Sequence, residues 1–358
     1  MSNKVLFLLP YPLSQAPSQR FRVEAYYDLL RQQGISFDSH VFLDDTAWKI
    51  LYQGGSTLQK AVAVIKGYLK RFGKVVFSAR AYDYVFIHRE AAPLGPPIFE
   101  WLLAKILRKK VIYDFDDAIW IPSITESNKI ARHIKAFWKI AFICRWSYKI
   151  SAGNAFLANW AKQYNPRVVI NPTCVDMEVR FNKIKTPVEG QKVVIGWTGS
   201  HSTLKYLDEI FPVLQRLENE FEFDFLVICN QPPKFALNSL LFIKWREVTE
   251  IEDLLQMDIG IMPLVADAWS EGKCGFKLIQ YLSLGIPCVA SPIGVNKQIV
   301  EEGRNGFLCH SEENWYLALK QLLTNYHLRK EMGLAGHEKM HKEFSIQSNA
   351  ANFLSLFS

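Results

Sequence analysis

Disulfides, zinc sites and membrane spans all lack a basis in this 358-residue sequence. The six cysteines are scattered singly, with no C-x-x-C pair and no zinc-like spacing to the eight histidines, so we expect buried thiols in a reducing cytosol. No stretch reaches the roughly eighteen uncharged apolar residues of a spanning helix, and the early run VLFLLPYP is too short for a signal peptide. Short repeats and low-complexity segments are also absent. We therefore expect a cytoplasmic protein that is not an integral membrane protein.

Acidic residues are scarce in the first half of the chain. Residues 1–180 contain 25 Lys and Arg against 14 Asp and Glu, a net charge of +11, whereas the remainder has 17 against 21, a net charge of −4. A basic half favours an anionic partner such as a phospholipid surface, a phosphorylated acceptor or nucleic acid, although ordinary surface charge explains the same counts. The composition, 49% hydrophobic and 22% charged, is that of a packed protein, and the length suits two domains.

Short runs rich in Val and Ile alternate with stretches of helical spacing. The apolar runs cover residues 5–9, 84–88, 110–115 and 167–172, and then residues 193–200, 224–230, 241–245, 258–264, 287–291 and 306–309. One helical stretch in the first half, RFRVEAYYDLLRQQG, stops at Gly34, and another lies around residues 205–221. Continuous apolar strands alternating with helices predict parallel sheets that are buried on both faces.

The repetition of this pattern predicts an α/β protein with two Rossmann-like domains that face a cleft. We expect an N-terminal domain over residues 1–175, a polar linker over 176–192, a second domain over 193–340 and a final helix over 341–358 that returns toward the first domain. In such sheets ligands bind at the carboxyl ends of the strands, where loops lead into helices. Residues that directly follow strands are therefore the candidates for function.

The segment KCGFKLIQYLSLGIP, residues 273–287, joins such a loop to a helix. Its apolar positions have helical spacing, and Gly285 followed by Pro287 ends the helix. At its start Gly275 lies between Lys273 and Lys277, so backbone N–H groups, the positive end of the helix dipole and two ammonium groups gather where a diphosphate can bind. Two solvated lysines beside a helix are the alternative.

Five blocks in order carry a family resemblance: DIGIMPL, GKCGFKLIQYLSLGIPCVAS, PIGVNKQIV, EEGRNGFLC and a helical tail that opens with EFS. Together they resemble the C-terminal domain of GT-B glycosyltransferases of group 1 (family 4), over about residues 193–345. The resemblance of the first half is looser. It implies a retaining, metal-independent transferase without a cofactor, whose C-terminal domain holds a nucleotide-diphosphate sugar and whose N-terminal domain holds the acceptor.

Two glutamates separated by seven residues are usual in this family. The second, which binds the donor ribose, falls on Gln280, and the first, which meets the sugar, falls on Gly272 with Glu271 beside it. Gln280 can still exchange hydrogen bonds with a ribose diol, although it lacks the charge. The resemblance makes Glu271 the candidate for a displaced catalytic acid.

The remaining donor contacts follow other strands. Family members often carry an arginine just after the first strand of this domain and a lysine several residues on. Lys205 matches the lysine, whereas Trp197 and Thr198 stand in the arginine's region. A turn made of Gly199 and Ser200 can offer backbone N–H groups to the phosphates. The resemblance completes the expected donor site with Phe276, Gly294, Val295 and Asn296.

In the first half, His88 and Arg89 end a strand, and Asp114, Asp116 and Asp117 follow the next one. The family commonly has a histidine at a comparable place, so His88 and Arg89 are candidate catalytic residues, although a histidine at a strand end is often structural. An Asp-x-Asp motif holds a divalent metal in the GT-A transferases, but such an enzyme would not repeat the Rossmann pattern after a linker. We expect Asp116 and Asp117 to serve the acceptor side or the structure, and expect no metal.

Basic side chains mark three other places in the first half. We expect Arg20 and Arg22 at a helix start, where they oppose the dipole unless an anion docks nearby, and the resemblance puts their loop on the acceptor side, without the paired glycines of many relatives. Residues 63–74 and 128–149 have basic and aromatic faces. The second stretch either lies on an anionic membrane or packs against the core. Its basic residues are Lys129, Arg132, Lys135 and Lys139, and its apolar ones include Ile130, Ile134, Phe137 and Trp138.

The sequence thus predicts a cytoplasmic glycosyltransferase, peripheral at the inner face of the cell membrane. Its partners would be a nucleotide sugar, a glycan or lipid-linked acceptor of the cell envelope, and an anionic membrane surface, with no nucleic acid. Two alternatives stay open. One is a sugar-nucleotide epimerase of the same architecture, and the other is a non-catalytic relative that binds a nucleotide sugar, which the missing glutamate and glycine pair favour.

Overall fold

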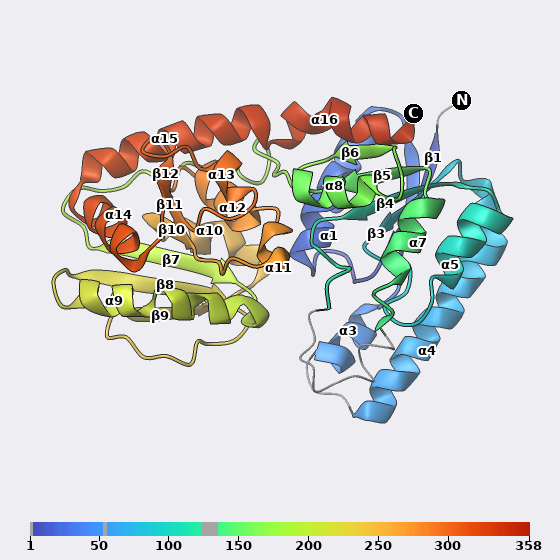
Figure 1. Cartoon of the computed structure of the whole chain (residues 1–358), viewed down its shortest axis with the longest axis horizontal. Helices are drawn as coiled ribbons and strands as arrows, with labels where there is room; N and C mark the ends of the chain where they lie inside the picture. The colour runs from blue at the N-terminus through green and yellow to red at the C-terminus, as the bar shows by residue number, and fades with distance from the viewer. Residues whose placement is uncertain (1–2, 53–55, 123–134) are drawn as a thin grey trace. The chain divides into compact units, whose positions relative to one another are not determined.

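Two six-stranded sheets, parallel throughout, form the framework of the protein (Figure 1). In spatial order the first sheet consists of β2 (Ser36–Val41), β1 (Lys4–Leu9), β3 (Tyr84–His88), β4 (Lys110–Phe115), β5 (Lys149–Ala152) and β6 (Val168–Ile170). The second consists of β12 (Gly306–Leu308), β11 (Cys288–Ala290), β10 (Ile259–Met262), β7 (Val193–Gly199), β8 (Phe223–Cys229) and β9 (Leu240–Lys244).

The computed structural model describes residues 3–52, 56–122 and 135–358, and the chain divides into two units. The N-terminal unit comprises Met1–Thr173 and Ala350–Ser358, and the C-terminal unit comprises Cys174–Asn349. Residues 176–192, the predicted linker, contain no helix or strand and are grouped with the C-terminal unit. The last residues pack within the N-terminal unit, where the Phe353 ring stacks on Tyr26 at a centroid distance of 3.9 Å.

Helices connect the strands in both units. Those of the N-terminal unit are α1 (Pro17–Arg22), α2 (Tyr27–Gln32), α3 (Asp45–Tyr52), α4 (Thr57–Gly73), α5 (Ile98–Trp101), α7 (Lys139–Trp146) and α8 (Ala155–Lys162). Those of the C-terminal unit are α9 (Phe211–Glu218), α10 (Glu250–Leu254), α11 (Ala268–Glu271), α12 (Phe276–Ser283), α13 (Asn296–Ile299), α14 (Glu312–Thr324) and α15 (Tyr326–Glu343). Helix α16 (Ile346–Leu354) begins in the C-terminal unit and ends in the N-terminal unit.

Alternation along β10 places helices on both faces of the second sheet. Ile259 and Ile261 face a core that α9 and α14 close. Gly260 faces the opposite side, where a side chain on it would overlap the ring of Tyr281 from α12. The Tyr281 hydroxyl accepts a 2.9 Å hydrogen bond from the Thr198 N–H, which ties α12 to the end of β7. The glycine in β10 thus lets α12 approach the sheet closely.

The structure confirms every predicted strand and adds two. The added strands are β2 and β5, which have no continuous apolar run because β2 is a half-exposed edge strand and β5 has only four residues. All six cysteines are buried and free, as predicted. Gly285 has φ of 71° and ends α12, also as predicted.

The expected position of Arg20 and Arg22 at a helix start is wrong. The helical stretch is broken into α1, a 3-10 turn (Glu24–Tyr26) and α2, so both arginines lie in the last turn of α1. There the helix dipole favours a basic side chain, and no anion is needed to explain them.

The stretch over residues 128–149, which was expected either to lie on a membrane or to pack against the core, is only partly described. Lys129, Ile130, Arg132 and Ile134 lie outside the described residues. Lys139 is 2% exposed and pairs with Glu90 at 2.8 Å, so for this residue the core-packed alternative holds and the membrane-facing one does not. Among the described residues, no helix is long and apolar enough to cross a membrane.

Candidate active site

Helix α12 begins at a glycine that its surroundings require. Gly275 has φ of 65°, a left-handed conformation that strains other residues. A Cβ atom placed on it would lie 2.2 Å from Cδ1 of Ile299 and 3.0 Å from Cγ1 of Val295. The α12 N-terminus is therefore held against α13 by backbone contact, which fixes the direction of its first N–H groups.

Three lysines approach two buried aromatic rings beside this terminus. Nζ of Lys205 lies 5.3 Å from the centre of the Tyr206 ring, and Nζ of Lys273 lies 5.6 Å from the same ring. Nζ of Lys277 lies 5.5 Å from the centre of the Trp197 ring. Tyr206 and Trp197 are 4% and 1% exposed, so the rings themselves are fixed in the core. Lys205 thus lies near Lys273 and Lys277, which follow it by 68 or more positions in the sequence. Together the three lysines bring positive charge to one region, as a diphosphate site requires.

The turn after β7 contributes backbone to the same region. A Cβ atom on Gly199 would lie 2.5 Å from the Trp197 ring, so only glycine fits there. Ser200 starts the 3-10 helix His201–Glu209 and accepts, through its carbonyl oxygen, the N–H of Thr203 at 2.9 Å. This short helix carries Lys205 and Tyr206, which explains why the lysine lies near the α12 segment.

The loop before α13 closes the other side of the α12 terminus. Gly294 has φ of 54°, and a Cβ atom on it would lie 2.9 Å from the carbonyl oxygen of Glu271. Asn296 is 1% exposed; its Nδ2 donates to the Ser291 carbonyl, whereas its Oδ1 has no hydrogen-bond partner in the described structure. That orphaned oxygen would lie 3.6 Å from a Cβ atom on Gly275. A buried acceptor without a partner is costly, and a donor group of a ligand would satisfy it.

The structure brings most of the predicted donor residues together. Glu271 ends α11 directly before the lysine pair, and Val295 and Asn296 contact the position of Gly275. Phe276 is half-buried in the first turn of α12, and Gln280 is 3% exposed one turn further. The sequence did not reveal Tyr206 or the supporting role of Trp197. An aromatic residue next to a lysine in sequence does not indicate which ammonium groups will approach its ring in the fold.

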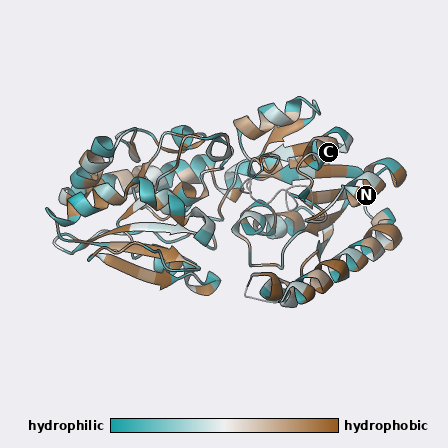
Figure 2. Ribbon diagram, turned by 60° about the horizontal axis from the view of Figure 1, so that its bottom comes forward, coloured by the Kyte–Doolittle hydropathy of each residue, from teal (hydrophilic) through white to brown (hydrophobic). Residues whose placement is uncertain are grey.

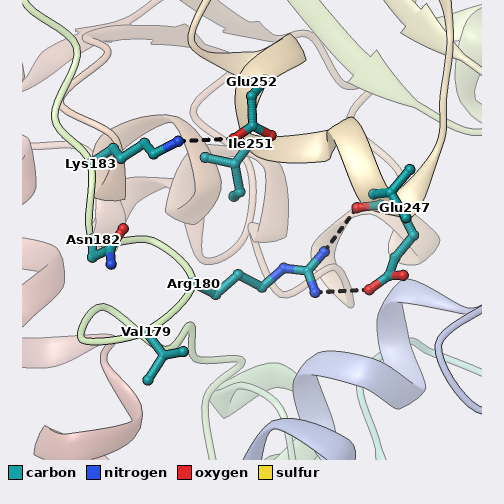
Figure 3. A pocket seen from close by; sticks show the side chains of 8 residues that line it. Val179, Arg180, Asn182, Lys183, Glu247, Ile251 and Glu252 are labelled. Atoms are coloured by element: carbon teal, nitrogen blue, oxygen red, sulfur yellow. Dashed lines mark hydrogen bonds and ion pairs between the residues drawn. The ribbon is translucent and has the colours of Figure 1, made fainter.

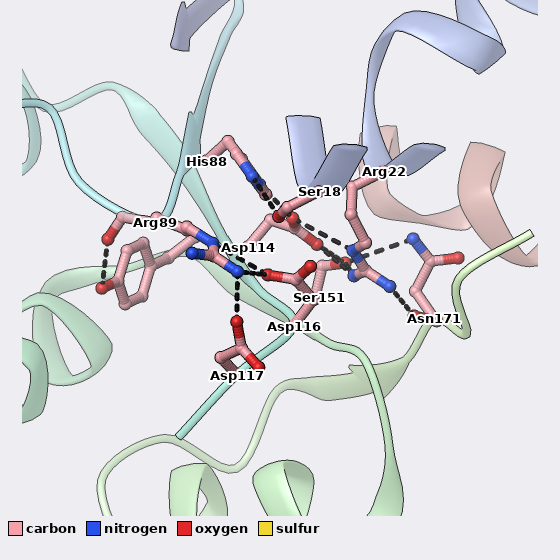
Figure 4. A network of polar contacts seen from close by, with 10 residues as sticks. Ser18, Arg22, His88, Arg89, Asp114, Asp116, Asp117, Ser151 and Asn171 are labelled. Atoms are coloured by element: carbon pink, nitrogen blue, oxygen red, sulfur yellow. Dashed lines mark hydrogen bonds and ion pairs between the residues drawn. The ribbon is translucent and has the colours of Figure 1, made fainter. Parts of the chain in front are cut away.

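The predicted catalytic histidine lies in a buried polar network of the N-terminal unit (Figure 4). His88 is fully buried; its Nδ1 lies 2.8 Å from Oδ2 of Asp114, and its Nε2 lies 2.9 Å from Oγ of Ser18. Asp114 also pairs with Arg22, which in turn donates to the carbonyl of Asn171. Burial alone would raise the pKa of Asp114, but Arg22 and then His88 hold it below its ordinary value. Within this hydrogen-bonded network, half-buried Ser18 is the residue most exposed to solvent.

Arg89 and the two remaining aspartates form a second charged group. The guanidinium of Arg89 pairs with Asp116 at 2.7 Å and with Asp117. Burial would lower the pKa of Arg89, but the two carboxylates raise it well above its ordinary value. Burial likewise opposes ionisation of Asp116, whose pKa Arg89 nevertheless lowers. Arg89 therefore already pairs with Asp116 and Asp117, and Asp114, the other member of the Asp-x-Asp motif, pairs with Arg22. Among the described residues, no three His, Cys, Asp or Glu side chains are grouped closely enough to hold a metal.

Arg20, the last predicted acceptor-side residue, is 5% exposed, and its guanidinium lies 5.0 Å from the centre of the Phe21 ring. A separate cavity of about 550 Å³ lies in the C-terminal unit (Figure 3). Its charged groups are paired with one another: Arg180 bonds to Glu247 and Glu250, and Lys183 bonds to Glu252. None of the predicted donor residues lines this cavity, so the glycine and lysine arrangement around α12 is the better candidate site.

The matching family model supports this choice. Residues 192–325, which contain the whole α12 site, match the model described as "Glycosyl transferases group 1". Over this part of its length the chain is similar to the group 1 glycosyltransferases.

Two solved structures have the same fold as this chain. One is Anabaena HepE, solved in complex with UDP and glucose, at 15% identity over 99% of this chain and 100% of that one, with a TM-score of 0.67. The other is sucrose-phosphate synthase from Thermosynechococcus elongatus, at 10% identity over 100% and 98% of the two chains, with a TM-score of 0.66. The chain described here therefore has the GT-B fold.

A curated relative matches over a shorter stretch. Spore coat protein SA of Bacillus subtilis is 29% identical over 79 residues, which are 21% of this chain and 21% of the relative. The match thus spans about a fifth of the length of that protein and indicates similarity of one segment of this chain.

Proposed function

We propose that this protein transfers a sugar from a UDP-sugar to a glycan or lipid-linked acceptor of the cell envelope. The observation that carries the proposal is the placing of Lys205, Lys273 and Lys277 around two buried rings at the N-terminus of α12. When the glycosidic bond to the donor phosphate breaks, negative charge grows on the leaving diphosphate. Ammonium and N–H groups already fixed around it stabilise that charge more than they stabilise the intact donor, and so they speed the reaction.

The choice of UDP draws on the HepE structure, which contains UDP and glucose in one case and UDP-glucose in another. In the proposed site Gln280 binds the ribose hydroxyls, and Glu271 with the 294–296 loop meets the sugar. Gly199 and Ser200 offer N–H groups to the phosphates. The three lysines take the place that a divalent cation has in metal-dependent transferases, so the proposed reaction needs no metal.

The proposed acceptor side is the N-terminal unit. Ser18 is the solvent-accessible end of a hydrogen-bonded series that runs through His88 to Asp114. Arg89 forms ion pairs with Asp116 and Asp117, whose side chains are 11% and 22% exposed. Carboxylates fixed in this way suit the hydroxyls of a sugar acceptor, because each accepts hydrogen bonds without losing its ion pair. We further propose retention of the anomeric configuration and a location at the inner face of the membrane, where a lipid-linked acceptor would be found.

A non-catalytic role as a nucleotide-sugar-binding protein is the second candidate. It is favoured by Gly272 and Gln280, which stand where the family has two glutamates. The purified protein with a panel of UDP-sugars and crude cell-envelope lipids separates the two by measurement of UDP release. Acceptor-dependent release of UDP is expected. Tight UDP binding without any release would support the binding protein, and interconversion of two UDP-sugars without UDP release would indicate an epimerase.

A further inference from the structure

Helix α4 presents its large apolar side chains outward. Leu58, Val62, Ile65, Leu69 and Phe72 recur every three or four residues along one side and are 52–74% exposed. Figure 2 shows hydrophobic segments along this long helix. This is the reverse of a surface helix that buries its large apolar residues in its own domain.

The inner side of α4 packs on the N-terminal unit through other residues than the large apolar ones. Its buried residues are Ala63, Gly67 and Arg71, two of them small. A Cβ atom on Gly67 would lie 2.7 Å from the ring of Phe42, so the helix sits on Phe42 by backbone contact. Arg71, fully buried, donates to the Leu9 carbonyl. The helix is thus fixed to the unit without using its large apolar residues, which are left for another partner.

A second apolar surface adjoins α4. Tyr68 of α4 packs against Phe99 of α5, with ring centroids 5.9 Å apart, and its hydroxyl donates to the Leu94 carbonyl. Beyond α5 a wholly apolar hollow of about 260 Å³ is lined by residues that include Trp101 and Trp138, which are 44% and 56% exposed. We call the outer stripe of α4 and this hollow together the apolar face.

The charges around the apolar face have one sign almost throughout. Residues 46–82 contain seven Lys and Arg and no Asp or Glu, residues 101–113 contain four and none, and residues 135–149 contain four and none. Of these basic residues, Arg71 and Lys139 are buried and do not contribute to the surface. Exposed lysines lie in each of these segments, at positions 66, 105 and 135. In the described structure, Lys70 of α4 forms an ion pair with Asp44 at 2.7 Å.

We propose that the apolar face docks the protein on a lipid bilayer with anionic headgroups. Exposed Leu, Ile and Phe side chains enter the acyl boundary, the two tryptophans sit at headgroup depth, and the flanking lysines meet lipid phosphates. The inference rests on the proposed function only for the idea of a lipid-linked acceptor, since docking itself needs neither donor nor acceptor. It also places the membrane contact on α4, instead of on the helix over residues 128–149 alone.

The test is co-sedimentation of the full-length protein with vesicles of equal parts phosphatidylglycerol and phosphatidylcholine at low salt. The variant Ile65→Gln/Leu69→Gln removes two exposed apolar side chains and should retain the fold. A matched control, Leu317→Gln/Leu334→Gln, changes two leucines that are 53% and 50% exposed in the C-terminal unit. The α4 variant should bind vesicles about tenfold or more weakly than wild type, and the control should bind like wild type.

Charge is tested separately. Lys60→Glu/Lys66→Glu should weaken binding to the mixed vesicles, and wild-type binding should fall as salt rises or when phosphatidylglycerol is left out. Failure of the wild-type protein to sediment, or equal binding by the α4 variant, would overturn the proposal. The proposal would also be overturned if the wild type were a dimer and the α4 variant a monomer, since the apolar face would then join two copies of the chain.

UDP affinity, measured by calorimetry on the same samples, keeps this test apart from the proposed function. Vesicle binding that fails while UDP binds overturns the docking surface alone. UDP binding that fails while the protein still sediments with vesicles overturns the donor assignment alone. A far-UV circular dichroism spectrum and a melting temperature like those of wild type show that the α4 variant has folded.

Discussion

The ammonium group of Lys277 lies 5.5 Å from the centre of the Trp197 ring. Because Trp197 is 1% exposed and part of the core of the C-terminal unit, the ring cannot move away from the charge. A cation over an aromatic ring gains about 0.5–1 kcal/mol at a partly exposed site. Lys277 is therefore held near its working position before any ligand arrives, and less side-chain entropy is lost on binding a diphosphate.

Gln280 provides a test of the ribose contact. Gln280→Ala should weaken UDP binding about tenfold, because hydrogen bonds to the ribose diol are lost, each worth about 1 kcal/mol. Affinity for 2′,3′-dideoxy-UDP should not change, since that ligand offers no diol. Calorimetry with both nucleotides measures the difference.

The control for this test is Gln298→Ala, an exposed glutamine on α13. It should leave both affinities unchanged. An equal loss for both nucleotides in the Gln280 variant would show that Gln280 supports the helix and not the ribose.

Metal removal tests the role of the lysines. UDP release from the donor should persist in excess EDTA, because ammonium and N–H groups carry the leaving-group charge and Arg89 already occupies Asp116 and Asp117. Loss of release in EDTA that manganese or magnesium restores would assign a metal to the reaction and contradict the proposed mechanism.

Strands could be predicted from the sequence where their apolar runs are long enough to be recognised. Strands such as β8, with a long apolar run between turns, were predictable, whereas β5 and the edge strand β2 were not, because a four-residue strand and a half-exposed one lack that run. At the donor site Gly275 was predictable, because a left-handed residue before a helix leaves a local signature. The sharing of the Tyr206 ring by Lys205 and Lys273 was not, since it depends on tertiary contact between distant segments.

Arg22 shows a different limit. It was expected at a helix start, where an anion docked nearby would offset the helix dipole, yet it is fully buried and pairs with Asp114, 92 positions away. A charged residue followed by an apolar helix looks the same in sequence whether its partner is a substrate or a carboxylate of the next strand but one. Only the fold distinguishes the two.

Gly275 should resist substitution more strongly than Gly303, which is also left-handed. Gly275→Ala adds both backbone strain and overlap with Ile299, and should lower the unfolding free energy of the C-terminal unit by about 3 kcal/mol. Gly303→Ala is the matched control, because Gly303 has φ of 71° but open space around it, and should cost about 1 kcal/mol. Urea unfolding followed by fluorescence compares them, and equal losses would show that the contact with Ile299 is not limiting.

His40 should make the N-terminal unit less stable in mild acid. Burial, followed by Arg71, Lys74 and Lys70, lowers the pKa of His40 from 6.5 to about 4. As the pH falls through this window the unfolded chain takes up a proton that the folded chain does not, so stability is complete above about pH 6.5 and declines toward pH 4. In His40→Gln the melting temperature should drop less between pH 7.5 and pH 5 than in wild type.

The control for the pH experiment is His310→Gln, which changes an exposed histidine. Its melting temperature should follow the wild-type dependence on pH. A His40 variant with the wild-type dependence would mean that other groups cause the loss of stability in acid.

The most direct test of the account is calorimetric titration of UDP into the wild type, Lys205→Ala and Lys277→Ala, with Lys342→Ala as an exposed control on α15. If the lysines around Tyr206 and Trp197 hold the donor phosphates, each of the first two changes should weaken UDP binding by roughly 1.5–3 kcal/mol, the scale of charged hydrogen bonds. The control should bind UDP like the wild type. Wild-type affinity in both Lys205→Ala and Lys277→Ala would contradict the claim that this cluster is the diphosphate site.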